Sequence, residues 1–259
     1  KMAKGVYDRG QPLLQVGAVA ATSISLSLVP LISSYQLEAF KNIHQQVALS
    51  FKICFIVAIG ATAGLISMIE QVDYMLFADT KGSDVLSVFS ISILFSSVAI
   101  TSAGILQGVN EPVWPALSVL AGVAVKILLN ESLIPFFYTY GAALATVCGY
   151  GVVCLLNLIV LNRKKYDLVS FKDVWKMVGC AIVMFLSIKL FFFLFDLFIQ
   201  YETRMTAAIQ SLTAVVFGAV VYMFLIIHST IFRKEEIENL PFKNKLMLNR
   251  AWKERKENG

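Results

Sequence analysis

Seven runs of about 20 apolar residues dominate this sequence and limit what it can fold into. A helix needs about 20 such residues to cross the hydrocarbon core of a bilayer. The runs cover residues 12–34, 48–69, 85–107, 113–134, 139–161, 174–199 and 205–231. Only 15% of the residues are charged, against about 25% in a soluble domain. The sequence therefore predicts an all-α, polytopic membrane protein with seven transmembrane helices.

The lysines and arginines outside these runs predict the orientation. Seven spans place the two ends of the chain on opposite sides of the membrane. The C-terminal side carries eight basic residues in the tail, together with Lys41, Arg163, Lys164, Lys165 and Lys172. The other side carries Lys1, Lys4, Arg9, Lys81 and Arg204. Because basic residues concentrate in cytoplasmic segments, we expect an outside N-terminus and a cytoplasmic C-terminus. The net charge of +5 then reflects orientation, not nucleic-acid binding.

The mouth of the first run holds the first candidate site. Asp8, Arg9 and Gln11 precede Pro12, and proline is well tolerated in the first turn of a helix. Small residues follow at four-residue spacing, which lets another helix pack closely or leaves a face open to a cavity. The pattern suits the entrance of a transport pathway. The alternative is a simple interfacial anchor.

Other polar residues lie deeper in the predicted spans. Ionisable residues inside a membrane are costly and are functional candidates by default. Lys126 lies about half-way along the fourth span with Asn130 one turn further, and it either faces a polar interior or pairs within the bundle. Lys189 has very apolar neighbours, which favours a structural role.

Several further residues are expected to be structural. Lys52 and Lys176 lie near span ends and are expected to snorkel to the interface, and Glu70 and Asp73 are expected to be interfacial. The four cysteines lie in apolar runs and are expected to be buried free thiols.

Two stripes of small residues admit two interpretations, helix packing and pore lining. They are Ser92, Ser96, Ser97 and Thr101 on the third span, and Gly141, Ala145 and Gly149 on the fifth. Packing is the simpler interpretation, because small residues let membrane helices approach closely. The sixth span is instead crowded with phenylalanine, which suits contact with lipid chains.

Motifs for enzymatic chemistry are lacking. The sequence has no HExxH helix, Walker loop or G-x-S-x-G elbow, and its two histidines, His44 and His228, are far apart. We therefore expect a protein that is not an enzyme and that needs no cofactor or metal.

An ordered set of short motifs carries a family resemblance. It comprises Tyr7-Asp8-Arg9, Pro12, Leu28-Val29-Pro30-Leu31, Gln107-Gly108, Asn110-Glu111-Pro112, Lys126, Leu129-Asn130, Leu133-Ile134-Pro135, Gly141 to Thr146, Asn157 and the basic stop Arg163 to Lys165. In this order and spacing the set resembles the MurJ-type lipid II flippases and the related polysaccharide-export and sporulation proteins of the MATE-like flippase superfamily. The match covers about 160 residues.

The resemblance implies a fourteen-helix protein of two lobes that works by alternating access, with the seven spans here as helices 8–14, the C-terminal half. Residues 1–164 would form five core spans of an incomplete C-terminal lobe. Residues 174–231 would form a helix pair with a groove for a lipid tail, and 232–259 a basic cytoplasmic tail. The tail suits either an amphipathic helix on the inner leaflet or a solvated segment.

The same resemblance implies a function and a site. The chain would be part of a flippase in a bacterial plasma membrane that carries lipid II or a polyprenyl-diphosphate oligosaccharide. Arg9 would meet the diphosphate, helped by Asp8, Gln11, Lys126 and Asn130. Its partners would be the lipid-linked oligosaccharide, membrane lipids and the missing N-terminal lobe. Gln11 replaces an acidic residue of the family pattern.

Two alternatives remain open. A cation-coupled multidrug exporter of the same superfamily would need carboxylates inside the spans, where only Asp196 is a candidate. A membrane scaffold that does not transport would depend on the tail and not on Asp8 and Arg9. Since the chain opens on Lys1, we expect it to be a piece of a longer protein.

Overall fold

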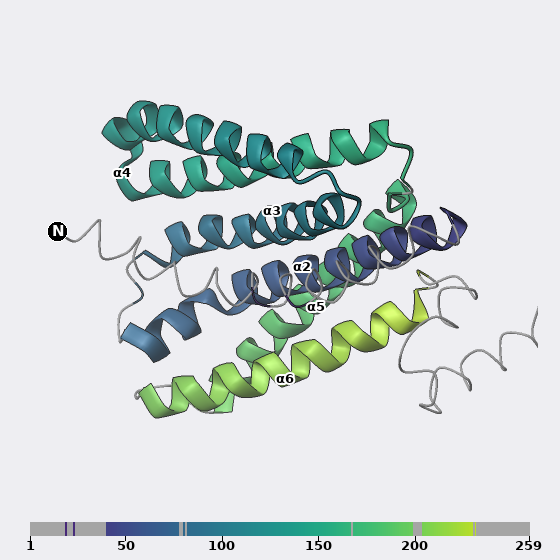
Figure 1. Cartoon of the computed structure of the whole chain (residues 1–259). Coiled ribbons are helices and arrows are strands. Elements are labelled where there is room, and N and C mark those ends of the chain that lie inside the picture. Colours follow the sequence, from purple (N-terminus) through teal and green to yellow (C-terminus); the bar gives the residue numbers. More distant parts are fainter. Residues whose placement is uncertain are drawn as a thin grey trace, which may run out of the picture.

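The described part of the chain is built from long apolar helices. The structure is a computed structural model that describes residues 19, 23, 40–77, 80, 82–166, 168–198, 204–229 and 231. Figure 1 shows α2 (Phe40–Phe77), α3 (Ser83–Gly108), α4 (Val113–Arg163), α5 (Phe171–Phe198) and α6 (Arg204–His228). All five are long and apolar enough to cross a membrane. The all-α prediction is confirmed for these residues.

The longest helix, α4, folds back on itself. Its backbone leaves the helical region at Tyr138 (φ 47°, ψ −123°), shortly after Pro135. Proline lacks the N–H that an inner helical turn requires, so the reversal follows it directly. The two limbs lie side by side (Figure 1) and overlap the predicted spans 113–134 and 139–161. The predicted span 12–34 lies outside the described residues, so the count of seven stays a prediction.

Glycine allows the limbs of α4 to touch. A Cβ atom added at Gly122 would lie 2.8 Å from the carbonyl oxygen of Gly149, and one at Gly149 would lie 3.2 Å from the carbonyl oxygen of Gly122. A Cβ at Gly141 would likewise lie 2.7 Å from the carbonyl oxygen of Leu133. The glycines of this stripe therefore serve helix packing.

The hydroxyl residues of α3 are also packed between helices. Ser92, Ser96, Ser97 and Thr101 are all buried. The hydroxyl of Thr101 donates a hydrogen bond to Sγ of Cys54 on α2 at 3.2 Å. On the other side, Nδ2 of Asn157 from α4 donates to the carbonyl oxygen of Ala99 at 3.3 Å. The packing interpretation of this stripe is confirmed, and the pore-lining interpretation is wrong for it.

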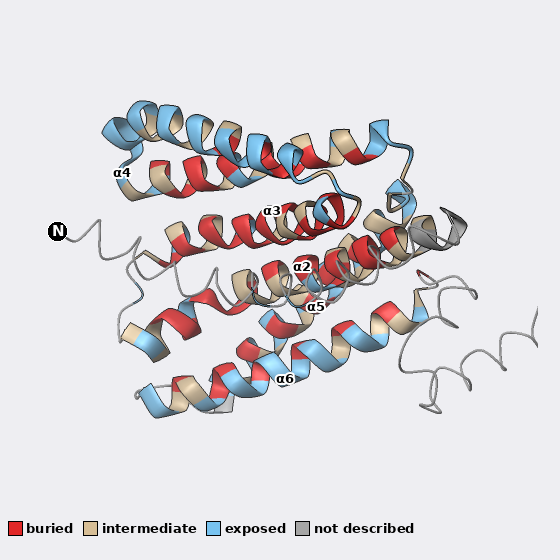
Figure 2. Cartoon of the chain, viewed as in Figure 1, coloured by how far each residue is buried: buried red, intermediate tan, exposed pale blue. Residues whose placement is uncertain are grey.

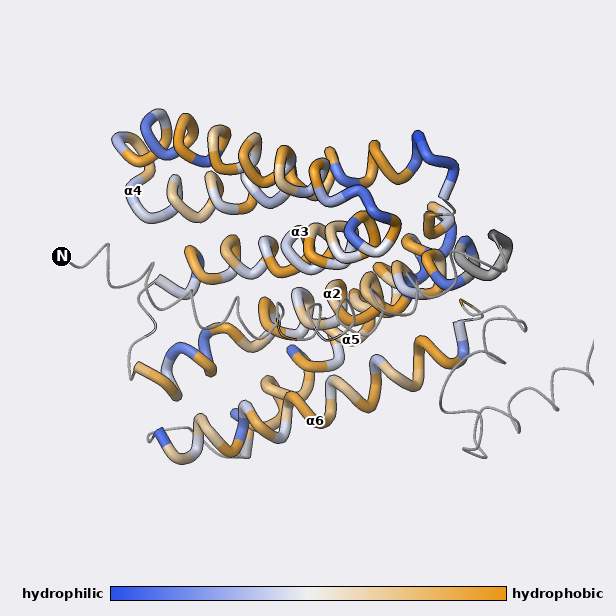
Figure 3. Tube along the Cα trace, viewed as in Figure 1, coloured by the Kyte–Doolittle hydropathy of each residue, from blue (hydrophilic) through white to orange (hydrophobic). Residues whose placement is uncertain are grey.

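Helix α2 lies between two groups of helices, with α3 and α4 on one side and α5 and α6 on the other (Figure 1). Burial differs between the groups (Figure 2). In the most hydrophobic window of α3, 61% of residues are buried, against 22% in α5 and 28% in α6. Hydrophilic residues gather toward the helix ends and connections (Figure 3). The exposed apolar faces of α5 and α6 therefore suit contact with lipid.

Three expectations about single residues need correction. Lys52 does not snorkel: it is 4% exposed, because its amine is held by groups on α5 and after α6. Asp73 is 1% exposed and accepts a hydrogen bond from the Ser83 hydroxyl at 3.2 Å, whereas Glu70 is exposed as expected. All four cysteines are free, but Cys148 is exposed.

The contact between the α4 limbs gives a test of the hairpin. We expect Gly122→Ala to lower the stability of the protein by about 1–3 kcal/mol, as overpacking typically does. Gly151→Ala is the matched control on the same helix, since nothing lies within 4 Å of its added Cβ. It should be neutral or stabilising, because alanine is the better helix former by up to about 1 kcal/mol. Thermal unfolding of both variants in detergent would measure this, and equal midpoints would contradict the packing.

Candidate functional site

A pocket of about 280 Å³ lies where α3 meets the two limbs of α4. Small and apolar side chains form most of its wall, and Lys126 brings a cationic side chain to it. The lining residues are Ala99, Ile100, Ala103, Val119, Gly122, Val123, Lys126, Thr146, Gly149, Tyr150 and Val153. The pocket therefore combines a positive charge with apolar surroundings.

The position of Lys126 depends on the close contact of the two limbs. A Cβ added at Gly149 would lie 3.2 Å from the Cβ of Lys126, so a larger residue at 149 would press on the lysine stem. Lys126 is half-buried. The nearby Thr146 hydroxyl donates to the carbonyl oxygen of Ala142 at 2.9 Å, and this bond orients its side chain along the helix. The glycines that close the hairpin thus also shape the wall around the cation.

Asn130 lies one turn beyond Lys126 on the same limb. Residues four apart share a helix face, so the two side chains form one polar strip on α4. The Oδ1 atom of Asn130 is buried and has no hydrogen-bond partner among the described residues. A buried amide oxygen without a partner costs about 1–3 kcal/mol. The strip therefore offers a cation and an amide acceptor next to each other.

The predicted site residues are thus only partly placed. The structure puts Lys126 in the pocket wall and Asn130 beside it on α4. Asp8, Arg9 and Gln11 lie outside the described residues, so their approach to Lys126 stays a prediction. Lys189 is exposed on α5, with its amine 6.0 Å from the ring centre of Phe185.

One polar contact in the apolar region was missed from the sequence. Gln210 on α6 is fully buried, and its Nε2 donates to Oδ1 of Asp196 on α5 at 3.0 Å. The sequence feature that could have indicated this contact is Gln210 itself, a polar residue within an apolar run. The Asp196 carboxylate thus has a hydrogen-bond partner on α6.

The pocket is suited to holding an anion. A lysine ammonium in apolar surroundings is a strong partner for phosphate or carboxylate oxygens, because the low local dielectric strengthens the interaction. No group of three His, Cys, Asp or Glu side chains that could hold a metal occurs in the part of the chain that the structure describes.

The helices and the comparisons with known proteins define a multi-pass membrane protein. No protein-family model matches the chain. The chain is 40% identical over 261 residues to the uncharacterized membrane protein YabM of Bacillus subtilis (strain 168), covering 100% of this chain and 48% of YabM. It is 30% identical over 226 residues to the lipid II flippase MurJ of the same organism, covering 83% of this chain and 41% of MurJ.

Two further similarities extend this result. The chain is 23% identical over 242 residues to the probable low-salt glycan biosynthesis flippase Agl15 of Haloferax volcanii, covering 91% of this chain and 49% of Agl15. Its fold matches the solved structure of lipid II flippase MurJ in an inward closed conformation, with a TM-score of 0.60 and 18% identity, over 83% of this chain and 46% of that one. The chain belongs to the MurJ-type flippase family. It spans about half the length of the curated relatives it matches.

Access to the pocket can be measured by thiol chemistry. We expect a cysteine at position 126 to react with a charged, water-soluble thiol reagent. If water reaches the pocket, the reagent can enter it and the thiol can ionise to the reactive thiolate. A cysteine at Leu128 is the matched control: this residue is 63% exposed on the same limb but does not line the pocket, so the cysteine should face lipid and react poorly. Replacing Cys148, which is exposed, removes the background. Equal rates at the two positions would contradict a water-accessible pocket.

Proposed function

We propose that the chain is the C-terminal half of a flippase that moves a lipid-linked cell-wall precursor across a bacterial plasma membrane by alternating access. Its similarity to proteins named as lipid II and glycan flippases supports this proposal. So do the fold shared with MurJ and the coverage of about half of each relative. In this proposal the seven spans are helices 8–14, and the other half supplies the second lobe.

The observation that carries the proposal is the cation in a largely apolar pocket. Precursors such as lipid II carry an anionic diphosphate between a sugar headgroup and a prenyl chain. Lys126, with Asn130 beside it, offers charge and a polar partner to such a headgroup. Arg9 would bind the diphosphate with its planar fork, aided by Asp8 and Gln11 at the mouth of the first span.

The helices α5 and α6 are proposed to hold the prenyl chain. Phe193 and Leu197 are 69% and 71% exposed on α5, and Phe191 stacks on Phe217 of α6 with ring centres 5.4 Å apart. A rigid aromatic contact between two largely exposed apolar helices gives a surface that accepts a hydrocarbon chain. The headgroup would then cross through the lobes while the chain stays in lipid.

Electrostatics explains why cations are needed along this route. Moving a negative charge outward against the membrane potential costs about 2.3 kcal/mol per charge per 100 mV. Lysine and arginine on the route offset the charge of the diphosphate. The proposed orientation, with the N-terminus outside, places Arg9 near the outer mouth.

The multidrug-exporter alternative has less support. Its ion coupling would need a carboxylate inside the bundle. Asp196 is exposed and accepts a hydrogen bond from Gln210. Asp73 is buried, but it accepts a hydrogen bond from Ser83 at the start of α3 and does not line the pocket.

The proposal is tested by transport in cells that depend on the whole flippase. We expect Lys126→Met to slow the appearance of outward-facing precursor by about 10- to 100-fold, since a hydrogen bond to a charged group is worth about 1.5–3 kcal/mol. Arg9→Ala should abolish transport. The measurement is the fraction of precursor that an externally added degrading enzyme can reach.

Lys189→Met is the matched control, because it removes a membrane lysine that lies on α5 and outside the pocket. It should transport normally. Normal transport by the Lys126 variant would remove the pocket from the mechanism, and normal transport by the Arg9 variant would remove the proposed headgroup contact.

A further inference from the structure

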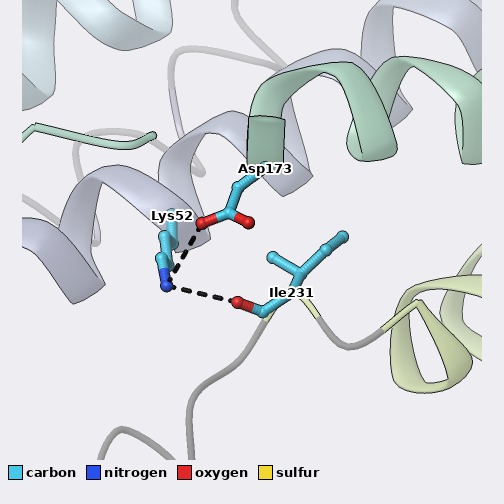
Figure 4. Close-up of polar contacts among 3 residues, drawn as sticks. All are labelled: Lys52, Asp173 and Ile231. Carbon is cyan, nitrogen blue, oxygen red and sulfur yellow. Dashed lines mark hydrogen bonds and ion pairs between the residues drawn. The ribbon is translucent and has the colours of Figure 1, made fainter. Parts of the chain in front are cut away.

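A buried lysine joins three elements at one end of the molecule. Figure 4 shows Lys52 of α2 pointing toward Asp173, in the first turn of α5, and toward the backbone of Ile231, just beyond α6. Its Nζ lies 3.6 Å from Oδ2 of Asp173 and donates to the carbonyl oxygen of Ile231 at 3.2 Å. Lys52 is 4% exposed and Ile231 1%. The start of α5 and the end of α6 are thus held by the same cation.

The local charges favour this arrangement. Carboxylates stabilise helix N-termini and cations stabilise helix C-termini, where carbonyl groups lack partners. Asp173 occupies the first turn of α5, and Lys52 faces the chain that leaves α6. A buried ion pair that also makes a hydrogen bond holds its partners in one geometry. We refer below to Lys52, Asp173 and the Ile231 carbonyl group as the Lys52 junction.

Further contacts fasten the same end. The connection between α4 and α5 passes beside it. The ring of His44 on α2 contacts that of Tyr166, tilted by 31° and with ring centres 5.1 Å apart, and Lys164 pairs with Glu111. Val169 packs against two of the apolar clusters of the protein. The chain that leads into α5 is therefore anchored near the Lys52 junction.

The contacts between α2 and the α5–α6 pair differ from one end of α2 to the other. Close to the junction, the hydroxyl of Tyr222 donates to the carbonyl oxygen of Ile56 at 2.9 Å, and its ring lies against Gly60. Beyond Gly60, α2 and the pair share an apolar cluster that includes Met68 and Met184. A hydrogen bond restricts the relative orientation of the two helices that it joins. Methionine side chains instead adapt to different packing arrangements.

Among the described elements, α5 and α6 make their extensive contacts with each other and with α2. Their exposed faces suit lipid, and helices in a bilayer lack a hydrophobic force that drives them together. For the apolar contacts in the cluster of Met68 and Met184, separation of the pair from α2 would exchange apolar protein surface for apolar lipid.

We propose that the Lys52 junction is a pivot on which the α5–α6 pair swings relative to the α3–α4 group. The junction stays closed during the motion, and the opposite end of the pair, where α5 ends and α6 begins, moves. This mechanism does not depend on the molecule that the protein carries. It assigns Lys52 and Asp173 a positioning role in a conformational change.

Distances between spin labels at the two ends test the pivot. The far-end pair is Phe136, 78% exposed at the α4 hairpin, and Met205, 74% exposed at the start of α6. The junction-end pair is Val113, 63% exposed at the start of α4, and Phe224, 60% exposed near the end of α6. Both pairs are placed in the whole chain, with the four native cysteines replaced by alanine, and measured in lipid nanodiscs by pulsed electron resonance.

We expect a broad distance distribution at the far end and a narrow one at the junction end. Lys52→Met should broaden the junction-end distribution until it matches that of the far end. Lys176→Met removes an exposed lysine from α5 as the matched control, and both distributions should stay as in the parent protein. Equal widths in the parent protein would overturn the proposal, and so would a junction-end distribution that stays narrow in Lys52→Met.

A second variant covers the case in which Lys52→Met fails to fold. Removing one partner of a buried ion pair leaves the other charge unpaired, whereas replacing both with apolar residues is often tolerated. Lys52→Met combined with Asp173→Leu should therefore fold, and it should show the same broadened junction-end distribution. A narrow distribution in this double variant would mean that apolar packing holds the end of the pair, and the pivot would be wrong.

Discussion

Hydrocarbon offers no hydrogen-bond partner, and this constraint governs where each polar group of the protein lies. A polar group inside the bilayer must therefore be satisfied by the protein itself. On α3 the hydroxyl groups of Ser90 and Ser102 donate to the carbonyl oxygens of Leu86 and Ala99, within their own helix. Such residues are small and internally satisfied, so a helix rich in serine can be the most buried of the described helices. The fold depends on this use of serine as a packing residue.

The same constraint separates three lysines that look alike in sequence. Lys52 is buried, and its charge is compensated by a carboxylate and a helix end. Lys189 keeps its amine at an exposed face beside Phe185. Lys126 is half-buried on the wall of a pocket. A structural role explains the first, and the third combines charge with space for a ligand. Surroundings, not depth in the span, therefore single out Lys126.

The sequence predicted the helices well because apolar runs of membrane length admit few other structures. It also predicted the reversal between 134 and 139, where Pro135 lies. It could not predict the partners of Lys52, because Asp173 and Ile231 lie far away in the chain. Asp73 was misjudged for a similar reason, since its burial arises from the packing of α3 against α2. Contacts between distant segments depend on tertiary packing, and periodicity carries no information on them.

The candidate site shows how much a residue type alone can reveal. Lys126 and Asn130 stood out in the sequence because polar side chains are costly in a span, and the structure adds a pocket and a buried amide oxygen. The sequence favours packing for the stripe that includes Gly149, and the close approach of the α4 limbs agrees with this. Gly122 and Gly149 bring the α4 limbs together and also leave room for the lysine stem. A protein that needed only a tight hairpin could place an apolar residue at position 126 and avoid the cost of the charge. The close-packed glycines and the costly lysine on one wall agree with the proposal of a frame that presents a cation to an anionic ligand.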